Sequence, residues 1–322
     1  LSSLLHEVHP ETKIYNLDIV EPGTPLPTVK NYKPALRKGE EHAATFIYCD
    51  VRQPIELEKV NITPDDVIFN FAAVHRTPGH PDPAYFETNI RGAENVCAFA
   101  ERHGIRKIVF TSSIAPYGAA EELKEETTLP MPNTPYGISK LVAEKIHQTW
   151  QAGGEGRQLT IVRPGVVFGR GENGNFTRLY WGIRGHKFMY PGRKDTIKAC
   201  IYVKELVRFM LYRLEHHDSG VELYNCCYEP AYTIEHIVES MKRVTNMKVK
   251  VPFMPGWLIM TAAGIAGALG SPMGICPARV RKLQISTNIC GKKLSASGYR
   301  FHYTFEEALA DWYKDNGNLY LQ

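Results

Sequence analysis

Long hydrophobic runs are nearly absent from this 322-residue sequence, and charge of one sign is not massed in any segment. The most membrane-like segment, Trp257–Leu269, is shorter than the roughly 20 apolar residues that cross a bilayer. We therefore predict no transmembrane segment, and we favour a buried or substrate-covering helix there over an interfacial anchor. No basic stretch followed by an apolar run opens the sequence, so no signal peptide is predicted.

The charge and the cysteine content argue against two further classes of protein. The net charge is only +4 and the Lys and Arg residues are scattered, so nucleic acid is not an expected partner. The seven cysteines include an adjacent pair and show no CxxC spacing, so no metal site is predicted. An odd number of cysteines fits a reducing compartment, and we expect a cytoplasmic protein.

The composition is that of a globular protein, and the order of its segments indicates an α/β fold. Hydrophobic residues make up 43% of the sequence and charged residues 22%, which is enough for a sizeable core. Short apolar runs alternate with amphipathic stretches in the first half, which is typical of βαβ units and a parallel sheet. The expected strands are Lys13–Ile19, Ala44–Tyr48, Val67–Ala73, Lys107–Ser112 and Leu159–Arg163, and the expected helices are Tyr85–His103 and Tyr136–Trp150.

After Arg163 the pattern becomes less regular, and we expect a smaller α/β lobe interleaved with a doubly wound, Rossmann-like sheet. Residues 1–164 and 197–228 are predicted to bind the dinucleotide, and residues 165–196 and 229–322 to bind the substrate. Two later runs, Ala199–Val203 and Leu223–Cys226, are expected to return to the main sheet as strands. Ligands of such sheets bind at the carboxyl ends of the strands, so the residues that follow each strand are candidates for the site.

Several strand ends carry residues that suit a nucleotide. Asp18 ends the first expected strand, where an acid can bind an adenosine ribose and would repel a 2′-phosphate, which favours NAD over NADP. The alternative is a solvated turn residue before Pro22. Ala72 and Ala73 follow another strand and let a ligand approach the backbone closely, although each could equally be a packing feature.

The strongest chemical signal is the pair Tyr136 and Lys140, which follows a turn that carries Ser112 and Ser113. A spacing of four residues puts the phenol and the ammonium on one helix face. The cation would lower the pKa of the phenol from its usual value of about 10 and make it a better general base. The spacing alone is weak evidence, because Tyr190–Lys194 repeats it around a Pro-Gly turn that is not helical.

Three motifs in a fixed order resemble the extended short-chain dehydrogenase/reductase family. They are TSSIAPYG at 111–118, PYGISK at 135–140 and IVRPGVVFGRGE at 161–172. Within the family they are most similar to the nucleoside-diphosphate-sugar epimerases and the 4-keto-sugar reductases. The resemblance extends from Asp18 to the GYRFHYTFEEALADW segment at 298–312, and it implies NAD as the cofactor.

The resemblance also implies a role for each matching residue. Tyr136 would be the acid/base, Lys140 would lower its pKa and hold the nicotinamide ribose, and Ser113 would hydrogen-bond the reacting oxygen. Besides Tyr136 and Lys140, the implied cofactor contacts are Asp18, Asp50, Val51, Phe71, Ala72, Ala73, Asn89, Ser112 and Pro164. The implied substrate contacts are Ser113, Asn175, Arg193 and Lys198.

The sequence departs from the family pattern in three places. The first strand and its GxxGxxG loop, whose N–H groups hold a pyrophosphate, are not found, so we expect a truncated chain that binds dinucleotide poorly. Val166 stands where the epimerases usually carry Asn, which favours a reductase, and Lys198 stands where an Arg is common. Ile114 and Ala115 offer no carboxylate, which disfavours a sugar dehydratase.

Together these features predict an NAD-dependent epimerase that oxidises a nucleoside-diphosphate sugar transiently, at C4, to a keto intermediate. The alternative with the same residues is an NAD(P)H-dependent keto-sugar reductase or dehydrogenase. A 3-beta-hydroxysteroid-type dehydrogenase and a non-catalytic dinucleotide sensor are disfavoured rivals. By analogy with the family, the helices Tyr85–His103 and Tyr136–Trp150 are expected to pair across a homodimer.

Overall fold

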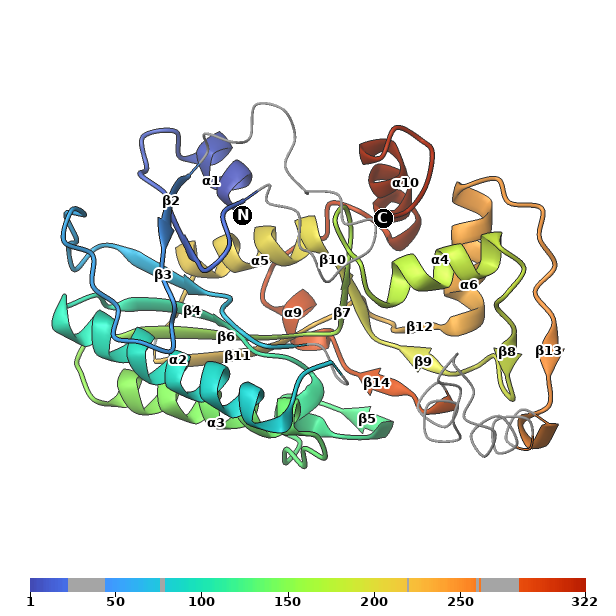
Figure 1. Cartoon of the computed structure of the whole chain (residues 1–322), viewed down its shortest axis with the longest axis horizontal. Coiled ribbons are helices and arrows are strands. Elements are labelled where there is room, and N and C mark those ends of the chain that lie inside the picture. The colour runs from blue at the N-terminus through green and yellow to red at the C-terminus, as the bar shows by residue number, and fades with distance from the viewer. Residues whose placement is uncertain (23–43, 76–78, 219, 259–260, 262–283) are drawn as a thin grey trace.

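The computed structural model describes residues 1–22, 44–75, 79–218, 220–258, 261 and 284–322. Elements of the first half are α1 (Ser2–Val8), β1 (Tyr15–Asp18), β2 (Thr45–Tyr48), β3 (Val67–Asn70), α2 (Asp82–Arg102), β4 (Lys107–Thr111), the 3-10 helix η1 (Ala115–Tyr117), β5 (Ala120–Lys124), α3 (Pro135–Ala152) and β6 (Gln158–Pro164). Those of the second half are β7 (Val166–Phe168), α4 (Asn175–Arg184), β8 (Tyr190–Pro191), β9 (Ile197–Lys198), β10 (Cys200–Tyr202), α5 (Val203–Glu215), β11 (Val221–Cys226), β12 (Tyr232–Thr233), α6 (Ile234–Val244), β13 (Phe253–Met254), β14 (Thr287–Ile289), α9 (Lys292–Ala296) and α10 (Phe305–Asp315). Figure 1 shows α2, α3 and α5 toward one end of the molecule and α4, α6 and β13 at the other.

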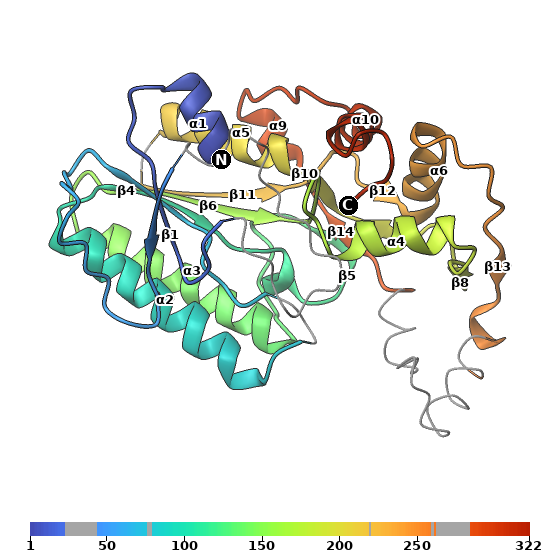
Figure 2. The same cartoon turned by 45° about the horizontal axis from the view of Figure 1, so that its top comes forward.

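A four-stranded parallel sheet, in the order β11-β6-β4-β3, forms the centre of the larger part. Because side chains alternate along a strand, Ile108 and Phe110 of β4 pack against α2 and α3, whereas Val109 packs against α5 on the opposite face. Both faces are therefore buried, which is why β4 and β6 are nearly continuous apolar runs. Figure 2 shows α2 and α3 on one side of this sheet and α1, α5 and α9 on the other. The predicted doubly wound, Rossmann-like α/β fold is confirmed.

Strands β1 and β2 pair in parallel with each other in a separate two-stranded sheet. In the described part of the chain, β1 pairs only with β2, and β3 pairs only with β4. One edge of each strand is thus open to a further strand. The expected absence of the family's first strand and glycine-rich loop stays a prediction.

The expected return of two later strands to the main sheet is half right. The run Leu223–Cys226 lies within β11, which pairs with β6 as predicted. The run Ala199–Val203 contains β10, which pairs with β7 instead, outside the four-stranded sheet. The reason is a close approach at Gly165, where a Cβ would lie 2.5 Å from the carbonyl oxygen of Ala199. The chain can leave β6 and enter β7 beside this backbone because glycine has no side chain.

The smaller lobe combines a mixed sheet in the order β12-β9-β14-β5 with a two-stranded sheet of β13 and β8. Its core is aromatic: Phe168 stacks on Phe176, with ring centroids 4.8 Å apart, and Trp312 is fully buried beside them. Strand β5 comes from the first half of the sequence, and β9 lies just inside the segment assigned to the dinucleotide part. Segments assigned to the dinucleotide part therefore contribute strands to the sheet of the smaller lobe. The predicted division into two parts stays a prediction.

Of the segment Trp257–Leu269, for which we expect a buried or substrate-covering helix, the structure describes only residues 257, 258 and 261. The side chain of Trp257 is 71% exposed and that of Leu258 is 41% exposed. Residues 259–260 and 262–269 lie outside the described residues. Among the helices of the described ranges, none is both long and apolar enough to cross a membrane.

Candidate active site

The turn after β4 places Ser113 beside the first turn of α3. The amide of Ile114 donates to the carbonyl of Pro164 at 3.2 Å, which ties this turn to the end of β6. The amide of Ala115 donates to the hydroxyl of Ser113 at 3.1 Å, and this hydroxyl is close enough to Tyr136 to lower the pKa of its phenol. The structure thus brings together two of the three predicted catalytic side chains.

Helix α3 begins where its sequence provides a start signal. Thr134 is the N-cap and its hydroxyl accepts from the amide of Gly137 at 3.1 Å, while Pro135 occupies the first helical position. Gly137 lets the helix approach η1, because a Cβ there would lie 2.6 Å from the carbonyl oxygen of Ala115. This close approach holds Tyr136, in the first turn of α3, next to the turn that carries Ser113.

Lys140 lies one helical turn after Tyr136, and its side chain is almost completely buried. Its ammonium sits over the ring of Phe110 in β4, 4.3 Å from the centroid. Burial lowers the pKa of Lys140 to about 7, and the nearby carboxylate of Glu144 opposes that shift. The ammonium therefore rests on the sheet.

The pKa of Tyr136 does not shift in the direction expected from its spacing to Lys140. Burial raises the pKa of the Tyr136 phenol, and the nearby hydroxyl of Ser113 opposes the rise. The ammonium of Lys140 faces the ring of Phe110. In this state Ser113 is the group that favours the ionised phenol.

A buried ion pair under α3 escaped the sequence analysis. Arg163 of β6 binds Glu144 through two hydrogen bonds of 2.8 and 2.6 Å, and both side chains are almost fully buried. The hydroxyl of Ser112 also donates to Glu144, at 2.5 Å, so it points into the protein, and the role of Ser112 toward a cofactor stays a prediction. The spacing gave a signal for this pair, since Glu144 follows Lys140 by four residues and shares its helix face.

A second buried contact, also missed, connects α3 to the loop after β3. His147 donates through Nδ1 to the carbonyl of Ala143 at 2.8 Å, so its Nε2 accepts from the side-chain amide of Asn70 at 3.2 Å. The oxygen of that amide accepts from the backbone of Ala72 at 3.1 Å. The conformation of the loop after β3 is thereby fixed by the same helix that carries Tyr136.

The predicted adenosine contacts follow β1 and β2 at the carboxyl end of their sheet. Asp18 is exposed, with one carboxylate oxygen accepting from the amide of Val20 at 3.1 Å. Asp50 is held by the guanidinium of Arg52, with contacts of 2.6 to 3.0 Å that lower the pKa of its carboxyl. The backbone carbonyl of Val51 accepts from Asn95 at 2.7 Å. Asp18 is thus an exposed carboxylate whose role toward a ribose stays a prediction, whereas the carboxylate of Asp50 already binds Arg52.

The predicted contacts to the middle of the cofactor lie in the loop after β3. Phe71 is 46% exposed, and the small side chains of Ala72 and Ala73 follow it. Asn89 of α2 exchanges hydrogen bonds of 2.8 and 3.1 Å with the backbone of Val74 and donates to Ser139 of α3 at 2.9 Å. Asn89 therefore connects this loop to the catalytic helix, and its role toward a cofactor stays a prediction.

The predicted substrate residues are only partly brought together. Arg193 binds Asp195 at 2.8 Å and Glu121 at 3.1 Å, and Lys198 donates to the carbonyl of Ile285 at 2.7 Å. Arg193 also reaches the neighbouring carbonyl at position 284, so both cations contact one short segment. Asn175 lies apart from them at the start of α4, 3.4 Å from a guanidinium nitrogen of Arg178.

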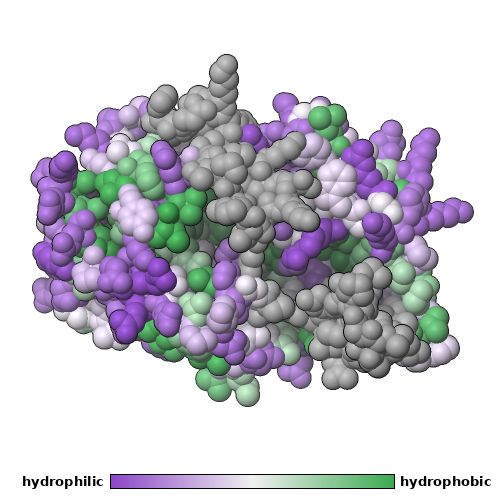
Figure 3. Space-filling view, viewed as in Figure 1, coloured by the Kyte–Doolittle hydropathy of each residue, from purple (hydrophilic) through white to green (hydrophobic). Residues whose placement is uncertain are grey.

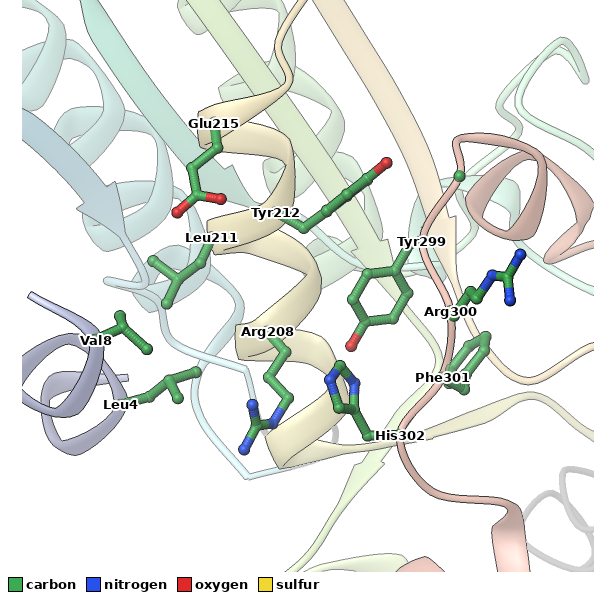
Figure 4. Close-up of a pocket in the computed structure, with 11 residues that line it drawn as sticks. Leu4, Val8, Arg208, Leu211, Tyr212, Glu215, Tyr299, Arg300, Phe301 and His302 are labelled. Carbon is green, nitrogen blue, oxygen red and sulfur yellow. The ribbon is translucent and has the colours of Figure 1, made fainter.

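Two cavities differ in their relation to these residues. One of about 410 Å³ lies between α1, α5 and the segment 298–302, where Leu4, Arg208 and His302 line it (Figure 4). It contains none of the predicted site residues. A smaller one, of about 270 Å³, lies between η1 and the segment that leads into α3, and Tyr117 and Met131 line it. In the described ranges no cluster of three or more His, Cys, Asp or Glu side chains could hold a metal ion.

Comparison with known proteins gives a family model and several curated relatives. The model of the NAD dependent epimerase/dehydratase family matches residues 20–227. An N-acetyl-alpha-D-glucosaminyl-diphospho-ditrans,octacis-undecaprenol 4-epimerase of Escherichia coli O157:H7 is 32% identical over 266 residues, which cover 81% of this chain and 80% of that protein. A UDP-glucose 4-epimerase of Lacticaseibacillus casei is 31% identical over 251 residues, covering 68% of this chain and 73% of the relative.

Solved structures show the same fold at lower sequence identity. A UDP-N-acetylglucosamine 4-epimerase from Methanobrevibacter ruminantium M1, in complex with UDP-N-acetylmuramic acid, has a TM-score of 0.72 at 21% identity and covers 98% of this chain and 94% of its own. A UDP-glucuronic acid 4-epimerase from Bacillus cereus in complex with NAD has a TM-score of 0.69 at 17% identity, with 99% and 95% covered.

Proposed function

Because this chain belongs to the NAD-dependent epimerase/dehydratase family, we propose that it inverts the configuration at C4 of a sugar. The reaction proceeds through transient oxidation of that carbon to a ketone. The observation that carries the proposal is that Ser113 lies close enough to Tyr136 to lower the pKa of its phenol, with Lys140 one turn along the same helix. The sugar is attached to a diphosphate. The curated relatives are 4-epimerases, which favours the epimerase over the keto-sugar reductase and over the steroid dehydrogenase.

Tyr136 is the acid/base that accepts and returns the proton in this reaction. Its phenolate oxygen takes the proton of the sugar C4 hydroxyl during oxidation and returns it when the ketone is reduced. The hydroxyl of Ser113 donates its single proton to the same sugar oxygen, and its place beside Tyr136 keeps the sugar oxygen and the phenol oxygen within reach of each other. Lys140, with a pKa of about 7, supplies positive charge near this site on the acid side of neutrality.

NAD is the cofactor of the family, and the residues present fit it. Asp18 has an exposed carboxylate that would accept from the ribose hydroxyls. The small side chains of Ala72 and Ala73 would let the middle of the cofactor approach the protein backbone closely. Lys140 and Tyr136 would hold the nicotinamide ribose. When bound, NAD accepts the hydride from the sugar carbon and gives it back. A carboxylate at Asp18 would repel a 2′-phosphate, so NADP is disfavoured.

The carrier of the sugar diphosphate has two candidates. A nucleoside is the carrier named in the UDP-glucose 4-epimerase relative, and an undecaprenol is the carrier named in the relative of Escherichia coli O157:H7. Both place a diphosphate next to the sugar. Arg193 and Lys198 supply cations for it, although Arg193 would have to exchange its contacts with Asp195 or Glu121.

We also propose a homodimer in the cytoplasm. Ile138 and Val142 lie one turn apart on α3 and are 40% and 36% exposed, which leaves an apolar strip on the helix expected at the dimer interface. Light scattering on the Ile138→Asp variant should then show loss of the dimer, whereas a monomeric parent protein would contradict the proposal. The six cysteines of the described residues are free thiols, which suits a reducing compartment.

The test of the reaction is an NMR assay on a panel of UDP-, GDP- and dTDP-sugars and of polyprenyl-diphosphate sugars, with nicotinamide absorbance followed in parallel. Inversion at one carbon with no net change in NAD is the expected result. Stoichiometric consumption of NADH on a keto-sugar would instead make the protein a reductase. Inertness toward every sugar would overturn the proposed function and leave the dinucleotide sensor as the alternative.

A further inference from the structure

The edge of the smaller lobe exposes a group of large apolar side chains. Phe253 is 51% exposed, Trp257 is 71% exposed and Leu258 is 41% exposed. They lie within six residues of one another, which we call the lobe-edge patch. In the space-filling view, hydrophobic residues reach the surface at the right-hand edge, where Figure 1 places β13 (Figure 3). Scattered apolar residues are normal on a surface, whereas a group of this kind marks an interaction site.

Backbone hydrogen bonds attach this patch to the segment that carries Arg193. The amide of Tyr190 donates to the carbonyl of Pro252, and the amide of Gly192 donates to the carbonyl of Met254, both at 2.9 Å. At Gly192, φ is +83° and a Cβ would lie 3.0 Å from the Cα of Gly256. The patch and the cation proposed for the sugar diphosphate are thus held together by adjacent backbones.

The charge around the patch favours one kind of partner. Lys248 and Lys250 are exposed just before it, and the sequence has no charged residue between Lys250 and Arg279. Exposed lysines beside an exposed tryptophan and aliphatic side chains are typical of a surface that lies in the headgroup region of an anionic bilayer.

We propose that the lobe-edge patch rests on the surface of an anionic lipid bilayer, and that the sugar diphosphate reaches the site while its polyprenyl carrier remains in that bilayer. This inference rests on the proposed function. Arg193 is next to the patch, so a diphosphate bound there would have its lipid chain leaving toward Phe253 and Trp257. The protein would sit on one face of the membrane without crossing it.

The surface itself is tested by sedimentation with vesicles of equimolar phosphatidylcholine and phosphatidylglycerol. The parent protein should sediment with these vesicles, and the variant Phe253→Ser/Trp257→Ser/Leu258→Ser should bind about tenfold more weakly. The matched control Val8→Ser/Val221→Ser removes exposed apolar side chains elsewhere, at 49% and 40% exposure, and should bind like the parent. Lys248→Glu/Lys250→Glu should weaken binding to these vesicles and not to pure phosphatidylcholine.

Activity separates this inference from the proposed function. On a polyprenyl-diphosphate sugar in vesicles, the triple variant should show a KM raised about tenfold with kcat unchanged, because its surface concentration falls. With a water-soluble nucleotide sugar, the parent and the triple variant should react at equal rates. A parent protein that does not sediment would overturn the membrane proposal, as would loss of the dimer in the triple variant, measured by light scattering, because a second copy would then cover the patch. Sedimentation without epimerisation of any sugar would overturn the proposed function alone.

Discussion

The two Tyr-x-x-x-Lys segments of this chain have the same spacing and very different surroundings. At 136–140 both side chains lie on α3, with Tyr136 beside Ser113 and Lys140 buried over Phe110. At 190–194 the chain leaves β8 and turns at Gly192, and the ammonium of Lys194 lies over the ring of Tyr190, 5.0 Å from its centroid.

The partners of the second pair argue against a catalytic role for it. Lys194 forms an exposed ion pair of 2.9 Å with Glu235. The hydroxyl of Tyr190 is buried and has no hydrogen-bond partner among the described residues, and burial raises the pKa of this phenol. A phenol needs a hydrogen-bonded partner and access to substrate to act as a base, and residue spacing provides neither.

The largest difference in activity is expected between the two variants in which the lysine of one pair is replaced by methionine. Lys140→Met should lower kcat/KM by about 10²- to 10³-fold, since it removes the ammonium one helical turn from the acid/base, and Lys194→Met should leave it nearly unchanged. The measurement is steady-state epimerisation of the sugar identified by NMR. Equal losses in both variants would end the distinction between the two segments.

Replacing the carboxylate that accompanies each lysine should change the free energy of unfolding by different amounts. Glu144→Gln leaves the guanidinium of Arg163 buried without its counter-ion and should reduce the free energy of unfolding by about 3–5 kcal/mol. Glu235→Gln removes an exposed pair and should change it by about 1 kcal/mol or less. Urea unfolding followed by circular dichroism measures both, and similar values for the two variants would contradict the buried pair under α3.

The smallest effect on stability at neutral pH concerns His147. Burial lowers the pKa of this side chain to about 4. Between about pH 6.5 and 4 the unfolded chain binds a proton that the folded protein does not, so His147 makes stability fall as the pH decreases through this window. At pH 7 it has no such effect. His147→Gln should therefore lose less stability than the parent between pH 6.5 and 4.5 in urea titrations, and parallel losses would show that His147 does not titrate on unfolding.

Much of the fold was predictable because local patterns and tertiary packing agree there. The apolar centres of β4 and β6 reflect burial on both faces, and Thr134 and Pro135 mark the start of α3. The pairing of β10 with β7 was not predictable, because the close approach of Gly165 to Ala199 depends on residues 34 positions apart.

The sequence indicated which residues lie in the candidate site. It did not indicate in which direction their side chains point. The spacing of Tyr136 and Lys140 shows that they share a face, but the ring of Phe110, from another element, decides where the ammonium rests. In the same way, Ser112 turns inward because Glu144 and Arg163 form a buried pair below it. Such orientations follow from contacts between distant segments, which spacing along one helix does not encode.

The most direct test compares Tyr136→Phe with Tyr190→Phe in the NMR epimerisation assay, with thermal unfolding as the folding control. Tyr136→Phe should lose at least about 10²-fold in kcat while it remains folded, because it removes the hydroxyl that carries the proton. Tyr190→Phe should keep the rate of the parent, since the hydroxyl that it removes is buried and unbonded. A folded Tyr136→Phe variant with the rate of the parent would contradict the central assignment.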